Sequence, residues 1–69
     1  MRKNLKEARQ RAGMTQKEVA EYLEITIQAY QKIEYGDRIG KIENWDKLED
    51  LFGIHQRRLR ENSSNQIIK

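Results

Sequence analysis

The sequence predicts an all-α fold, a compact bundle of four to five short helices. Apolar residues recur at helical spacing along most of the chain, and no segment alternates apolar and polar residues over a useful length. The chain has no proline, and three of its four glycines follow the end of a helical pattern. With 69 residues, of which 36% are hydrophobic, we expect one domain with a small core. The domain should span residues 1–61, and residues 62–69 should form a polar tail.

The first two helices are predicted over residues 4–12 and 16–23. Apolar residues spaced at i, i+3 and i+7 mark the inner face of the first helix, which Gly13 should end: Leu5, Ala8 and Ala12. Thr15 and Glu18 form a capping box, in which each side chain bonds the other residue's backbone amide. The second helix should therefore begin at residue 16, with an inner face made of Val19, Ala20 and Leu23.

A third helix is predicted over residues 27–35, with Thr26 as its N-cap and Gly36 at its end. Tyr30 and Ile33 should point inward. Helical geometry places four residues on the opposite, outward face: Ile27, Gln28, Gln31 and Lys32.

A fourth helix over about 42–52 and a short fifth helix near 55–61 complete the expected bundle. The apolar spacing of the fourth helix comes from Ile42, Trp45, Leu48 and Phe52, and Gly53 should stop it. Ile54 and Leu59 indicate the fifth helix.

Charge is distributed unevenly along the chain, whose net charge is +3. Residues 1–11 hold five basic side chains (Arg2, Lys3, Lys6, Arg9 and Arg11), whereas residues 43–50 are mainly acidic. A basic surface opposite an acidic one suits a polyanion that touches one side of the protein. On charge alone, a mixed solubilising surface explains the pattern equally well.

The sequence offers no chemistry typical of an enzyme. It has no cysteine and a single histidine, His55, and it lacks phosphate-binding, nucleophile and paired-acid motifs. We therefore expect no catalytic residues, no metal, no cofactor and no small-molecule ligand. No signal peptide or membrane-spanning run is present, which predicts a cytoplasmic protein.

The chain resembles the phage-repressor and Cro type of helix-turn-helix domain, the XRE family, over about residues 5–61. The segments that carry the resemblance are LKEARQRAGMTQKEVAEYL, the turn EIT, IQAYQKIEYGDR and IENWDKLEDLFGI. The features that recur together are Arg9, Gly13, Gln16, Ala20, Ile25, Ile33, Glu34, Gly36 and the run from Leu48 to Gly53. Two positions depart from the usual pattern: Glu24 stands where glycine is common, and Tyr30 replaces an aliphatic residue.

The resemblance implies a lambda-repressor-like fold whose helix 27–35 enters the major groove of double-stranded DNA. Candidates for base readout are Ile27, Gln28, Gln31 and Lys32. Candidates for phosphate contacts are Gln16, Thr26, Tyr35, Arg38 and Lys41. Arg9 and Glu34 look like the family's structural ion pair. By side-chain chemistry, Gln28 suits adenine and Lys32 suits guanine.

The function that we expect is a sequence-specific transcriptional regulator, a repressor that binds a pseudo-palindromic operator as a homodimer. The dimer candidates are Phe52, Ile54 and Leu59, together with the Ile67–Ile68 tail. Two alternatives remain open at this point. One is the antitoxin of a toxin–antitoxin pair that regulates its own operon, and the other is a protein-interaction module that does not read DNA.

Overall fold

The computed structural model describes residues 1–62, and these residues form five helices and no strand. The helices are α1 (Lys3–Arg11), α2 (Gln16–Leu23), α3 (Ile27–Tyr35), α4 (Ile42–Phe52) and α5 (Gln56–Leu59). The predicted all-α fold is confirmed, and the bounds of α2, α3 and α4 agree with those expected. The fifth helix is a single turn, shorter than predicted. The predicted Ile67–Ile68 contact lies outside the described residues.

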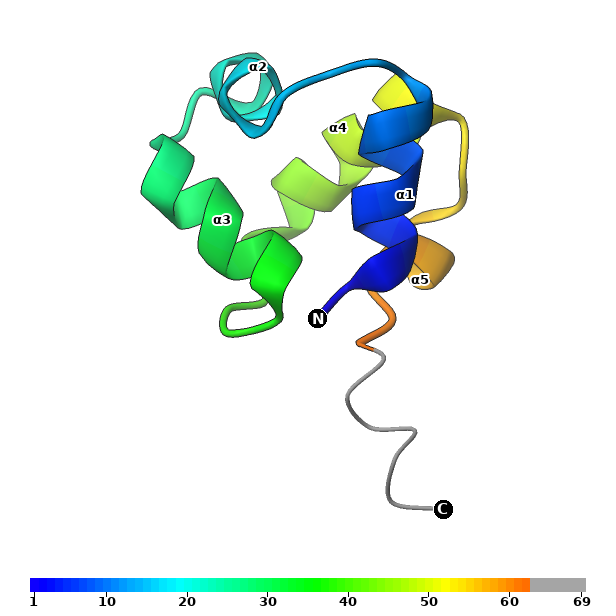
Figure 1. Ribbon diagram of the computed structural model, residues 1–69. Coiled ribbons are helices and arrows are strands. Elements are labelled where there is room, and N and C mark those ends of the chain that lie inside the picture. Colours follow the sequence, from blue (N-terminus) through cyan, green and yellow to red (C-terminus); the bar gives the residue numbers. More distant parts are fainter. Residues whose placement is uncertain (63–69) are drawn as a thin grey trace.

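The five helices divide into a helix-turn-helix pair and a supporting group. Figure 1 shows α3 along one side of the molecule with α2 above it, while α1 and α5 lie on the other side. Helix α2 packs against α3 and α4, α1 packs against α3 and α5, and α4 packs against α5. Because α3 lies at the edge of the molecule, one of its faces remains open to a partner.

One buried cluster joins all five helices: Leu5, Ala8, Val19, Ala20, Leu23, Tyr30, Ile33, Trp45, Leu48 and Leu59. The prediction that Leu59 contributes to a dimer surface is wrong, because its side chain is 0% exposed. Helix α5 is one turn long, and Leu59 is its single buried residue. Ile42 belongs to the apolar pattern that predicted α4, but it does not join the core, since this first residue of the helix is 71% exposed.

Local capping interactions position the helix-turn-helix pair. Both halves of the capping box are present at the start of α2, where Glu18 N donates to Thr15 Oγ1 and Thr15 N donates to Glu18 Oε1. Thr26 accepts a hydrogen bond from Ala29 N at the start of α3. Helix α2 ends at Glu24, whose φ of 61° and ψ of 41° place it in the left-handed region.

Glu24 is expected to strain the turn, because a side chain in this conformation costs about 1–2 kcal/mol. Glu24→Gly should therefore raise the free energy of unfolding by roughly 0.5–1 kcal/mol, after the greater unfolded-state entropy of glycine is subtracted. Urea denaturation measures this change. Glu21→Gly is the matched control, because it places glycine inside α2 and should destabilise by about 1 kcal/mol. If Glu24→Gly were less stable than the parent, the inferred backbone strain at Glu24 would be contradicted.

None of the helices formed by residues 1–62 has the length and apolar character needed to cross a membrane.

Candidate nucleic-acid interface

The outer side of α3 bears a shallow groove of about 390 Å³, which we call the reading groove. Its lining residues are Gln16, Gln28, Gln31, Lys32, Tyr35 and Asp37. The structure thus brings together five of the residues predicted to contact DNA. The sixth lining residue, Asp37, follows Gly36, the residue that ends α3. Gln28, Gln31, Lys32 and Tyr35 are all exposed, so their polar groups are accessible to a partner.

Two further residues predicted to contact DNA, Thr26 and Ile27, lie at the start of α3 and do not line the reading groove. Ile27 is half-buried and packs against the core, because it shares a helix face with Tyr30 and Glu34. Only part of its side chain is therefore available for an apolar contact with a base. The Thr26 hydroxyl accepts from the amide of Ala29, so this residue caps α3.

Arg38 and Lys41 do not line the reading groove. Both side chains are exposed, and both border a separate groove of about 560 Å³ between the α2–α3 turn, α3 and the start of α4. They follow α3 in the chain, where exposed cations can meet the DNA backbone beside a helix in the major groove.

A buried carboxylate lies behind the reading groove. Glu34 is 1% exposed, and Arg9 binds it through two bonds, Nε to Oε1 at 2.9 Å and Nη2 to Oε2 at 3.2 Å. Two further donors complete the site: the Tyr30 hydroxyl reaches Oε1 at 2.8 Å, and Gln16 Nε2 reaches Oε2 at 3.1 Å. The hydroxyl of the unusual Tyr30 therefore has an internal partner. This network joins α1, α2 and α3 at one point.

The network holds Glu34 ionised. Burial alone would raise the pKa of this carboxyl, but hydrogen bonds from Arg9, Tyr30 and Gln16 outweigh that effect and lower it. The hydrogen bond with Glu34 in turn raises the pKa of Arg9. Burial, reinforced by the negative charge of Glu34, raises the pKa of Tyr30 far above its ordinary value. At neutral pH, Glu34 is consequently an acceptor and Tyr30 a donor.

Arg2 holds the carboxyl end of α3. Its Nη1 donates to Ile33 O at 2.6 Å and to Arg38 O at 2.8 Å, and its Nε donates to Arg60 O at 3.0 Å. The side chain is only 4% exposed, and its guanidinium lies 5.4 Å from the centre of the Trp45 ring. A cation here also complements the negative end of the helix.

The buried position of Arg2 corrects the expected basic surface. The basic side chains of residues 1–11 were expected at the surface, and Arg2 was counted among them, but its side chain is buried. Arg9 was expected to pair with Glu34, and the structure contains that ion pair. No short-range pattern links residue 2 to the end of α3, so the sequence did not identify this role. The one feature that could have pointed to this role of Arg2 is the general preference of helix carboxyl ends for cations.

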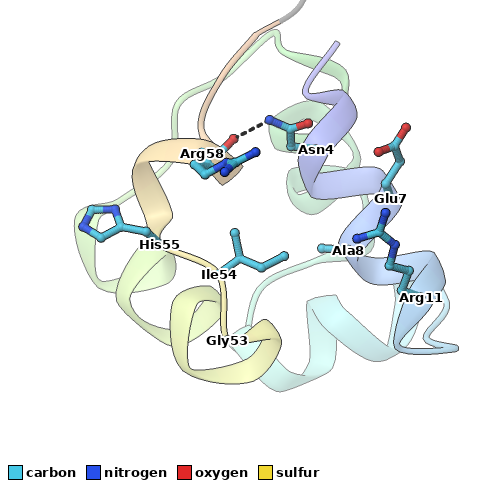
Figure 2. Close-up of a pocket in the computed structure, with 8 residues that line it drawn as sticks. All are labelled: Asn4, Glu7, Ala8, Arg11, Gly53, Ile54, His55 and Arg58. Carbon is cyan, nitrogen blue, oxygen red and sulfur yellow. Dashed lines mark hydrogen bonds between the residues drawn. The ribbon is translucent and has the colours of Figure 1, made fainter.

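A third groove lies on the other side of the molecule, between α1 and the α4–α5 connection (Figure 2). It measures about 460 Å³, and Ala8 and Ile54 form its apolar part. Asn4 Nδ2 donates to Arg58 O across it at 3.0 Å. His55 points away from Ile54 in this view, and its Nδ1 accepts from Arg57 N at 3.1 Å, which caps α5.

The dimer candidates Phe52 and Ile54 are half-buried and pack against the core. Within residues 1–62, no group of three or more histidine, aspartate or glutamate side chains is placed to hold a metal ion.

Comparison with known proteins agrees with this geometry. A family model described as helix-turn-helix matches residues 5–55, which include most of α1, all of α2, α3 and α4, and every residue that lines the reading groove. No curated protein and no solved structure matches the chain.

Proposed function

The chain belongs to the XRE family of helix-turn-helix DNA-binding regulators. We propose that it is a repressor that binds a pseudo-palindromic operator as a homodimer. The observation that carries the proposal is the reading groove, in which α3 exposes amides and a cation on its outer side. In the helix-turn-helix geometry, the second helix of the pair lies in the major groove and its side chains meet base edges.

Gln28 and Lys32 lie one helical turn apart on the exposed face of α3. A glutamine amide can pair with N6 and N7 of adenine, and a lysine can donate to O6 and N7 of guanine. Gln31 lies between them, and Ile27 offers the exposed part of its side chain to a thymine methyl group. We assign these four residues to base readout.

Phosphate contacts are assigned to residues on either side of the base-reading face. The amino end of α2 offers backbone amides, which favour an anion. Because the Gln16 side chain is bonded to Glu34 and Gln31, we expect the backbone amide of Gln16 to contribute here as well. The remaining contacts come from Thr26, Tyr35, Arg38 and Lys41.

We propose a homodimer because a pseudo-palindromic operator would present two half-sites to two recognition helices about 34 Å apart. Because Leu59 is buried in the core, Phe52 and Ile54 are the remaining predicted candidates for the contact between subunits. Ile39 and Ile42 join them, because both are large aliphatic residues with more than half of their surface exposed.

Base readout predicts that Gln28→Ala and Lys32→Ala each lose roughly 1–3 kcal/mol of binding free energy and relax base preference at one operator position. The loss follows from the removal of donors and acceptors that only the correct base satisfies. Fluorescence anisotropy measures it, with the duplex that the protein selects from random DNA and with single-base variants of that duplex.

Gln10→Ala and Lys47→Ala are the matched controls, since both residues are exposed on helices outside the reading groove. Arg38→Ala should instead weaken binding to all sequences similarly and reduce the slope of log K against log salt by about 1. Equal losses for Gln28→Ala and Gln10→Ala would argue against base readout by α3.

A further inference from the structure

Two hydrogen bonds connect the buried carboxylate to the reading groove. Gln16 Nε2 donates to Oε2 of Glu34 at 3.1 Å, and Gln16 Oε1 accepts from Nε2 of Gln31 at 3.1 Å. The first bond is partly buried, and the second lies at the surface. Gln16 therefore links an interior charge to a side chain that faces the partner.

The chemistry of the three groups determines which way each amide faces. An ionised carboxylate only accepts hydrogen bonds, so Gln16 must turn its NH₂ group toward Glu34. The carbonyl oxygen of Gln16 then faces Gln31, and an amide oxygen also only accepts. Gln31 must therefore turn its own NH₂ group toward Gln16. Neither amide can flip without placing two acceptors against each other.

This orientation leaves Gln31 with one N–H and its carbonyl oxygen Oε1 for an outside partner. Adenine offers a matching pair in the major groove, the N6 amino donor and the N7 acceptor. Guanine presents two acceptors, O6 and N7, and does not match the exposed oxygen. An amide that is already oriented loses less conformational entropy on binding, which favours affinity.

We propose that Gln31 is a preoriented adenine reader and that Gln16 is the residue that positions it, held in turn by Glu34. The inference rests on the proposed function and deepens it. It assigns the adenine contact to Gln31 instead of Gln28. It also gives the side chain of Gln16 a part in specificity, and leaves only the backbone amide of Gln16 for a phosphate contact.

The test compares the parent chain with Gln31→Ala, Gln16→Met and the double variant on a set of duplexes. The set contains the selected operator and every single-base change in one half-site. Gln31→Ala should abolish the preference for adenine at one position, a loss of roughly 5- to 150-fold in discrimination. Gln16→Met keeps the length of the side chain but removes its amide. It should reduce discrimination at the same position and leave other positions unchanged.

The double variant should discriminate no worse than Gln31→Ala alone, because Gln16 acts through Gln31. Gln28→Ala serves as the control and should alter a different position. Thermal unfolding of each variant verifies that the domain remains folded.

The possible results separate the two levels of the proposal. Unchanged adenine discrimination in Gln16→Met, or an equal loss of affinity at every position, would overturn the positioning role. If the parent selects an operator but Gln31→Ala keeps every base preference, Gln31 does not read adenine. The proposed function is then unaffected. A parent chain that selects no operator would overturn both.

Discussion

Replacement of Glu34 by alanine is expected to lower the free energy of unfolding by about 3–5 kcal/mol, as when one partner of a buried ion pair is removed. The change leaves the Arg9 guanidinium, whose side chain is 12% exposed, without its carboxylate. It also removes the acceptor of the Tyr30 hydroxyl and of the Gln16 amide. Because small domains are stable by only about 5–15 kcal/mol, much of the protein should unfold at moderate urea concentration.

Glu34→Gln is the matched variant, because it keeps the shape of the side chain and removes its titration. The pKa of Glu34 is lowered in the folded state, so its stabilising contribution is complete above its ordinary value near 4.5. That contribution is lost as the pH falls through the lowered pKa of the folded state. The parent should therefore lose stability in acid below about pH 4.5, and Glu34→Gln should lack this component. An unchanged melting temperature in Glu34→Ala, or equal acid dependence in both proteins, would contradict the network.

Replacement of Arg2 by alanine should destabilise the domain by roughly 2–4 kcal/mol, since each buried acceptor left without a donor costs about 1–3 kcal/mol. The carbonyl of Ile33 is the most buried of the three that lose their donor, and those of Arg38 and Arg60 are partly buried and can recover water. The contact with Trp45 is lost as well. Because these bonds hold the end of α3, we also expect weaker DNA binding.

Arg57→Ala is the control for Arg2→Ala, because Arg57 is an exposed arginine and its loss should change stability by less than about 0.5 kcal/mol. Arg2→Lys should recover only part of the loss, since one ammonium group cannot reproduce the forked geometry of a guanidinium. Urea denaturation of the three variants measures these differences. Equal stability of Arg2→Ala and Arg57→Ala would show that Arg2 is an ordinary surface charge.

The sequence predicted well where helices begin and end, because residues close together in the chain determine these positions. The capping box of Thr15 and Glu18 determines where α2 begins, and Gly36 ends α3 through its left-handed conformation. The sequence also showed that Glu24 stands where glycine is common, and the structure places it in the left-handed conformation that glycine adopts most easily. Such signals act over a few residues, so a single sequence contains them in full.

The features that sequence missed depend on contacts between distant parts of the chain. The role of Arg2 requires the ends of α3 and α5 to lie beside the amino terminus. The link from Glu34 to Gln31 through Gln16 requires the packed angle between α2 and α3. Leu59 has an apolar side chain that suits either a core or an interface, and only the position of α5 against α1 and α4 decides between them.

Selection of bound sites from random duplex DNA, with the purified chain at about physiological salt, tests the central claim most directly. Dimeric readout by α3 predicts an enriched pseudo-palindrome whose half-sites are centred about one helical turn apart, with adenine at a position that changes in Gln31→Ala. The absence of enrichment, with weak binding that fades as salt rises, would leave only nonspecific attraction to phosphates. That result would contradict sequence-specific regulation and favour a helix-turn-helix module that binds another protein.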